Sequence, residues 1–222
     1  YNTAVGELAM GTGSVAGATN NVAIGYKSLE DATDADNNIA IGKLSGSSIT
    51  GGDQNIFIGT SAGLATTGVD YCVIIGHEAG YANMVNGTGN ADGSVGIGAG
   101  TLQALTSGIG NVAVGRNALT AEDDGDFNTA VGHYALATQN GAAGNTGNTA
   151  VGWQAGTAVT TGTYNTLIGK SAGEAITTGT YNTCIGIGAG NSFDAESHNV
   201  LIGGGSGAFN GASELVVVGR GA

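Results

Sequence analysis

The chain is poor in charge, aromatic rings and cysteine, and it contains no proline. Charged residues make up 10% of its 222 residues and aromatic residues 5%, whereas glycine fills 44 positions. Five lysines and arginines stand against 17 acidic residues, for a net charge of −12. This balance argues against nucleic acid and anionic membranes as partners. No window holds 18 consecutive apolar residues, so membrane insertion through a helix is not expected.

Cys72 and Cys184 are the two cysteines. In a stack of one coil per repeat they would lie six coils apart, or about 29 Å at the spacing of adjacent strands. A disulfide needs Cα atoms within about 7 Å, so a bond within such a chain is excluded. We expect two buried free thiols, with a bond between chains or a reactive thiol as the alternatives.

What the chain has in abundance is a short repeat. Two consecutive copies, Thr160–Gly173 and Thr177–Gly190, agree at 11 of 14 positions. Thirteen related pentads, such as Asn148–Gly152, each close on a glycine, and eight of the twelve intervals between these glycines are 17 residues. A fixed short period indicates a repeat architecture in place of one globular core. The closing glycines are Gly6, Gly25, Gly42, Gly59, Gly76, Gly98, Gly115, Gly132, Gly152, Gly169, Gly186, Gly203 and Gly219.

Each pentad has the pattern of a strand. Val or Ile precedes the glycine, and Thr, Val or Ile stands two positions earlier, which favours extended backbone. The position between them is also apolar, as at Ile74 and Leu167, so both faces of the strand look apolar. We predict an all-β parallel β-solenoid (β-roll or β-helix) of about 13 coils with a 17-residue repeat. The valines and isoleucines are expected inside, and the alanine–leucine face is expected against a neighbouring chain.

Asparagine opens most of the pentads. Stacked once per coil, these side chains can hydrogen-bond to one another along the solenoid, and asparagine also tolerates the turn before a strand. The predicted structural asparagine ladder consists of Asn21, Asn38, Asn55, Asn111, Asn128, Asn148, Asn165, Asn182 and Asn199.

The position after the closing glycine carries large and charged side chains. Every lysine and arginine occupies this position or the next one, and the single tryptophan is there too. In stacked coils these residues would form a stripe whose cations and rings suit glycans and anionic groups. The plainer interpretation is a solvated corner where large side chains fit. The predicted binding ridge consists of Tyr26, Lys43, His77, Arg116, His133, Trp153 and Lys170.

Two acidic turns, residues 30–36 and 122–126, are candidates for Ca²⁺, because hard cations take several carboxylate oxygens. The alternative is a pair of solvated loops that keep the rod soluble. The second turn lacks the EF-hand pattern, and the Gly-Gly-x-Gly-x-Asp repeat of calcium-binding β-rolls is absent. We therefore assign no metal site and no cofactor.

Nothing in the sequence singles out a catalytic site. Gly-x-Gly stretches such as Gly96–Gly98 are products of the repeat, and phosphate loops need a strand–helix context. The three histidines lie in separate repeats, and no His, Cys and carboxylate set has metal-ligand spacing. We expect no catalytic residues and no enzymatic activity. Threonine pairs recur as in ice-binding arrays, but the row is broken in most repeats.

The Asn-(Thr/Val)-Ala-(Val/Ile)-Gly pentads, as in Asn21–Gly25 and Asn111–Gly115, resemble the head repeats of trimeric autotransporter adhesins, the YadA-like left-handed parallel β-roll. The stretch Thr160–Gly173 is more similar to repeats of phage tail fibres. The resemblance implies a left-handed homotrimer. Adhesin heads usually have a shorter repeat than this chain, so the shape of the coil is expected to differ. No chaperone catalytic motif of phage fibres is identifiable.

We expect residues 1–222 to form a single repeat domain within a longer fibre protein. The expected function is a non-catalytic structural segment for attachment to a host or cell surface, as in a phage tail fibre. The alternatives are a bacterial surface adhesin head that binds matrix or glycan, and a carbohydrate-processing β-solenoid enzyme. The expected location is extracellular, in a virion fibre or on a bacterial surface. The expected partners are two further copies of the chain and a receptor or glycan.

Overall fold

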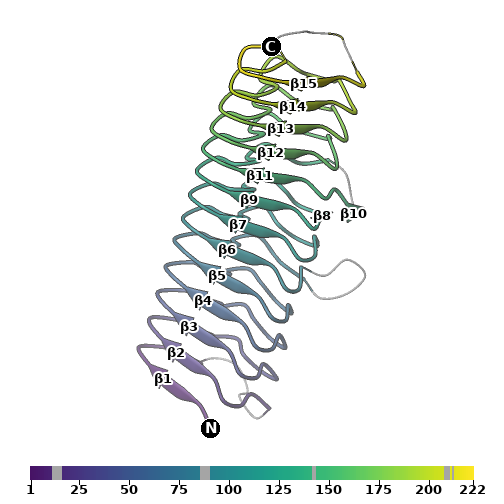
Figure 1. Cartoon of the computed structure of the whole chain (residues 1–222). Helices are drawn as coiled ribbons and strands as arrows, with labels where there is room; N and C mark the ends of the chain where they lie inside the picture. The colour runs from purple at the N-terminus through teal and green to yellow at the C-terminus, as the bar shows by residue number, and fades with distance from the viewer. Residues whose placement is uncertain (12–16, 86–90, 142–143, 208–210, 212) are drawn as a thin grey trace.

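The computed structural model describes residues 1–11, 17–85, 91–141, 144–207, 211 and 213–222. The chain is an all-β parallel solenoid in which each repeat contributes one short strand to a single 13-stranded sheet (Figure 1). The strands are β1 (Thr3–Val5), β2 (Val22–Ile24), β3 (Ile39–Ile41), β4 (Ile56–Ile58), β5 (Val73–Ile75), β6 (Val95–Ile97), β7 (Val112–Val114), β9 (Thr129–Val131), β11 (Thr149–Val151), β12 (Thr166–Ile168), β13 (Thr183–Ile185), β14 (Val200–Ile202) and β15 (Val216–Val218).

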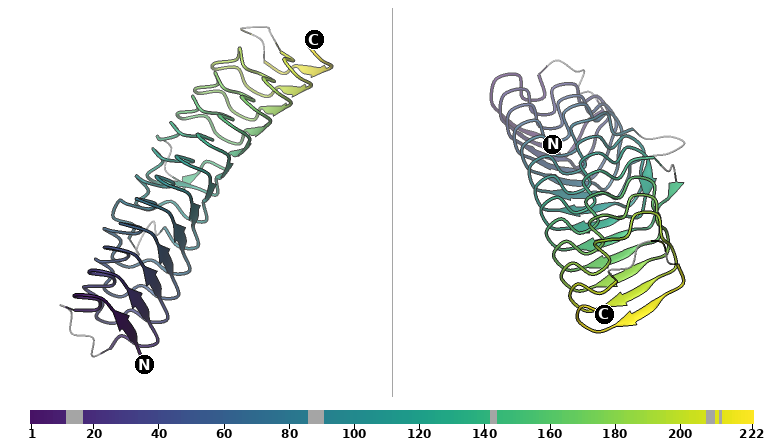
Figure 2. Two further views of the ribbon diagram at one scale, coloured as in Figure 1. Left: turned by 90° about the vertical axis from the view of Figure 1, so that its left-hand side faces the viewer. Right: turned by 90° about the horizontal axis from the view of Figure 1, so that it is seen from above.

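The coils stack into one continuous rod of about twelve turns, with the two termini at opposite ends (Figure 2). Two further strands, β8 (Gly125–Asp126) and β10 (Gly144–Asn145), form a separate parallel pair beside the main sheet. Each strand of the main sheet is the central part of one predicted pentad, so the predicted architecture and its 17-residue repeat are confirmed.

The strands stay in register even where one repeat is longer than its neighbours. Ile74 pairs with Gly96, and Ala130 pairs with Ala150, although both intervals exceed the usual period of the chain. The extra residues therefore lie between strands, and the sheet runs through these places without a bulge.

The closing glycines are required by close contact between coils. Gly115 has φ +129, and a Cβ atom there would lie 2.7 Å from the carbonyl carbon and oxygen of Gly132 in the next coil. Gly59 is in the same situation, since a Cβ atom would lie 2.6 Å from the oxygen of Gly76. Any side chain would separate the coils and break the ladder, so only glycine fits this column.

The prediction about which face of the strand points inward is wrong. The middle residues of the strands from β2 to β14 are buried and form the core of the coil, and Ile74 and Leu167 are 0% exposed. The flanking β-branched residues face outward, and Ile24 and Ile168 are 38% and 37% exposed. Leu167 and Ile74 are therefore core residues rather than subunit-facing ones, and the valines and isoleucines make the outer face of the sheet.

Two inward-facing columns of residues share the volume of the core, so that a large residue in one column generally accompanies a small residue in the other. The fourth residue after the closing glycine also points inward in the coils from β2 to β14, and there it is Leu or Gly. Where the strand carries Ala113, this position is Leu119; where the strand carries Leu167, it is Gly173. In the coils of Ala40 and Ala150 both positions are small, and Phe57 or Leu167 of the next coil fills the space. A Cβ atom on Gly173 would lie 2.6 Å from the Cδ2 atom of Leu167, so the two positions compete for one space. Both Leu119 and Gly173 have positive φ, at 48° and 59°.

The asparagines stack as an internal ladder. Asn21 Oδ1 accepts the backbone N–H of Asn38 at 2.8 Å and its side-chain amide at 3.2 Å. The Asn38 amide also donates to the Gly52 carbonyl at 2.7 Å. All nine asparagines named above are at most 1% exposed, so each rung bonds buried polar groups that would otherwise be unpaired.

A double-mutant cycle at Leu167 and Gly173 tests the shared core volume. We expect Leu167→Ala to lower the free energy of unfolding by about 2–5 kcal/mol through the cavity it leaves. Gly173→Leu alone should also destabilise, because the new side chain overlaps Leu167. In the double variant the new leucine fills the cavity, as Leu119 does beside Ala113, and part of the stability returns. Urea unfolding followed by circular dichroism measures this, and purely additive losses would contradict it.

The two cysteines give a second check on burial. Both are free and buried, and burial raises the pKa of each thiol to about 12. At pH 8 only about one thiol in ten thousand is then ionised, and the thiolate is the reactive form. We expect no labelling of the folded chain by iodoacetamide within an hour at pH 8, and labelling of both thiols in urea. Mass spectrometry counts the labels, and rapid modification of the folded chain would place a cysteine at the surface.

Candidate functional site

The outer face of the sheet is a continuous surface of β-branched side chains. It consists of the first and third residues of each strand, which form two rows along the rod. Ile41, Ile97 and Ile202 are 37%, 39% and 39% exposed, and the interior rows lie behind them. Five strands carry threonine in the first row, at Thr3, Thr129, Thr149, Thr166 and Thr183. We refer to these two rows as the outer sheet face.

The predicted ridge residues lie one per coil at the corner where each strand ends. The carbonyl of Lys43 accepts the N–H of Ser61 in the next coil at 2.9 Å, and the carbonyl of Trp153 accepts the N–H of Ser171 at 2.9 Å. The same contact recurs along the corner, so the structure brings the predicted residues into one file. Six of the seven are exposed, and His133 is half-buried.

The best-formed part of the ridge spans coils that follow one another. The Lys170 ammonium lies 5.1 Å from the centre of the Trp153 ring, and Trp153 is 43% exposed. His133, one coil before, packs its ring 4.2 Å from that of Tyr134. A cation held over an exposed indole leaves ring edge and positive charge free for a ligand, as acidic glycans require.

A second edge of the sheet was missed by sequence reasoning. It lies at the corner before the first residue of each pentad, and five coils carry an aspartate there: Asp36, Asp53, Asp70, Asp92 and Asp126. Asp53 Oδ1 accepts the N–H of Asp36 at 2.7 Å, and Asp70 Oδ1 accepts the N–H of Asp53 at 2.8 Å. Asp92 continues the file by accepting the N–H of Asp70 at 2.8 Å. The signal in the sequence is an aspartate two positions before the first residue of the pentad, which is asparagine, Cys72 or Ser94, in several neighbouring repeats.

The same corner carries a short aromatic file further along the rod. The rings of Tyr164 and Tyr181 stack at 5.0 Å, and those of Tyr181 and His198 stack at 5.1 Å. Because the rings cover one another's faces, they present mainly their edges to solvent. This arrangement suits intercoil packing better than stacking of a sugar ring.

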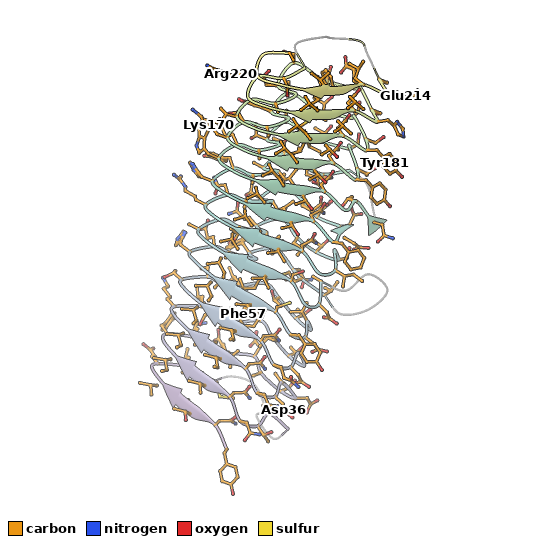
Figure 3. The ribbon with its side chains drawn as sticks, viewed as in Figure 1. Asp36, Phe57, Lys170, Tyr181, Glu214 and Arg220 are labelled. Carbon is orange, nitrogen blue, oxygen red and sulfur yellow. The ribbon has the colours of Figure 1, made fainter. Side chains whose placement is uncertain are left out.

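The two edges of the sheet therefore differ in charge. Lys170 and Arg220 lie beyond one end of the strands, whereas Asp36, Tyr181 and Glu214 lie beyond the other (Figure 3). All five lysines and arginines of the chain belong to the ridge corner. The outer sheet face is thus bordered by a basic and aromatic edge on one side and an acidic edge on the other.

The two acidic turns differ in their surroundings. In the first turn Glu30 pairs with Lys27 at 2.9 Å, near the surface. In the second, carboxylate oxygens of Glu122, Asp123 and Asp124 lie within 4.8 Å of one another, and Glu122 is wholly buried. Sequence reasoning found the second turn but gave no sign that its first carboxylate is internal.

Among the residues that the structure describes, no pocket indents the surface and no helix is long and apolar enough to cross a membrane. His77, His133 and His198 stand in separate coils, with His198 at the asparagine corner. A scan of protein-family models, a search of curated proteins and a search of solved structures each returned no match to this chain.

Proposed function

We propose that the chain is a rigid, non-catalytic fibre segment that serves attachment to a host or cell surface. The observation that carries the proposal is the outer sheet face, a largely aliphatic surface that runs the whole rod beside an exposed ridge of cations and rings. Stacked coils give length and stiffness, because each coil is hydrogen-bonded to the next. The outer face supplies a surface for assembly, and the ridge supplies one for a ligand.

The proposed assembly is a homotrimer formed through the outer sheet face. With two rows about 5 Å wide each and twelve steps of about 4.8 Å, the face covers roughly 600 Å². Patches of this size lie at the upper limit of what monomers leave exposed, and they approach the share each partner contributes to a stable interface. Three such faces turned toward one axis would be covered together.

The charges of the two edges favour a parallel arrangement. Rotation about an axis along the rod sets the ridge corner of one chain against the asparagine corner of the next, so the coils of Lys43 and Arg116 meet the aspartate file. Trp153 and Lys170 lie in coils where that corner carries threonine in place of aspartate, and they stay available to a ligand. An antiparallel dimer would set ridge against ridge and aspartate file against aspartate file, which repel. A cyclic trimer of parallel chains is consistent with this pattern.

Two kinds of fibre remain as specific candidates. The resemblance at Thr160–Gly173 favours a phage tail fibre, and the pentads favour a YadA-like adhesin head, each with a left-handed roll outside the cell. The Trp153 and Lys170 pair favours a glycan or matrix ligand for either one. Both candidates use the same two surfaces, so the following experiments test what they share.

Acidic substitutions on the outer sheet face test the assembly. We expect Val151→Asp together with Ile168→Asp to convert a trimer into monomers, because six charges would otherwise be buried at its axis. Thr178→Asp, at an exposed position away from this face, serves as the control and should leave the trimer intact. Light scattering after size exclusion gives the mass. A monomeric wild type at micromolar concentration, or an unchanged mass of the double variant, would refute the assembly.

Truncation of the ridge tests ligand attachment. We expect Trp153→Ala with Lys170→Ala to weaken binding to immobilised sialylated or sulfated glycans at least tenfold, with less effect on neutral ones. Tyr164→Ala is the matched control, since Tyr164 is also 43% exposed but lies at the opposite corner. Binding is measured on a glycan array. Equal binding by all three proteins would reduce the ridge to a solvated corner.

A further inference from the structure

Glu122 occupies a position that belongs to the apolar core. The seventh residue after the closing glycine is buried in most of the described coils, and the residues there include Ile49, Leu105 and Ile176, all 0% exposed. Glu122 stands in this column and is 0% exposed as well. An ionised carboxylate in such a position is costly unless it is paired.

Only half of this carboxylate is satisfied. Glu122 Oε1 accepts the N–H of Gly125 at 2.7 Å and that of Asp124 at 3.3 Å. Oε2 is buried and has no hydrogen-bond partner among the described residues. Gln139 follows one coil later in the same column. Its amide lies near enough to lower the pKa of Glu122, but its Nε2 atom forms no hydrogen bond of ordinary geometry within this part of the chain.

Two further carboxylates stand beside Glu122. Asp123 and Asp124 are half-buried, and one oxygen from each lies within 4.8 Å of one from Glu122. Burial raises the pKa of Glu122, and the charge of Asp123 adds to the effect, while backbone N–H groups and the nearby Gln139 amide offset part of it. Burial also raises the pKa of Asp124, again with a contribution from the charge of Asp123. The three groups therefore repel one another as they stand.

We propose that Glu122, Asp123 and Asp124 bind a divalent cation, and that the cation is Ca²⁺. Glu122 contributes an oxygen from the core side and the two aspartates contribute oxygens from the corner, with water completing the shell. Ca²⁺ binds 6–8 oxygens and tolerates irregular geometry, so the carboxylates of three consecutive residues on a turn can supply part of its coordination shell. Mg²⁺ requires near-ideal octahedral geometry and is the weaker fit. The inference does not depend on the proposed fibre function.

Calorimetric titration of the whole chain with CaCl2, after treatment with EDTA, tests the site. We expect one Ca²⁺ per chain with a dissociation constant in the range of about 10⁻⁴–10⁻³ M, as in extracellular modules. Glu122→Gln and Asp124→Asn should each weaken binding at least tenfold. Asp34→Asn, which removes the same charge from the other acidic turn, should bind like the wild type. MgCl2 in place of CaCl2 should bind at least tenfold more weakly.

Thermal unfolding with and without CaCl2 provides an independent readout. The midpoint of the wild type and of Asp34→Asn should rise with calcium, and that of Glu122→Gln should not. The Gln variant should be more stable than the wild type in EDTA, because an unpaired acid has left the core. Absence of heat and of a midpoint shift at 10 mM CaCl2, or equal responses of the Asp124→Asn and Asp34→Asn variants, would overturn the proposal. Equal binding of Mg²⁺ would overturn the choice of calcium.

Discussion

The fold depends on how closely the backbone of one coil approaches that of the next at the closing glycines. A side chain at Gly59 or Gly115 would collide with the following glycine, so the residue type at this corner is fixed by contact. Once these corners are in contact, each three-residue strand pairs in register with its neighbours, and the asparagine side chains form hydrogen bonds from coil to coil. Short strands suffice because every coil repeats the same bonds, and stability accumulates along the rod.

The repeat was readable from the sequence because its physical causes are local. Glycine at a closed corner, β-branched residues beside it and asparagine before the strand each serve one coil, and the period arranges them in columns. The inward face was not readable in the same way, because both faces of the strand are apolar. The decisive signal was the exchange of size between two columns, as in Ala113 with Leu119 and Leu167 with Gly173. That exchange reflects the fixed volume inside each coil. The alternation of apolar residues along a strand carries no information about this volume.

The same distinction between features that repeat in every coil and features that do not explains which candidate surfaces could be predicted. The ridge lies where the sequence placed it, since its residues share one position relative to the closing glycine. The aspartate file and the stacked rings of Tyr164, Tyr181 and His198 were missed because they hold different residue types in different coils. Their common property is their position just before the first residue of the pentad, not their chemistry. The buried state of Glu122 likewise depends on the column it occupies, whose other members are mostly aliphatic.

The preserved register across long intervals has a consequence for how such a rod can diversify. Ile74 and Gly96 remain paired although the longest interval of the chain separates them, and neither strand is displaced. Length can therefore change at the connection between coils while the shared sheet is untouched. The residues that the rod exposes between its strands can therefore change while the stacking of its coils stays the same. Segments can be gained or lost at these connections, and the fold is kept.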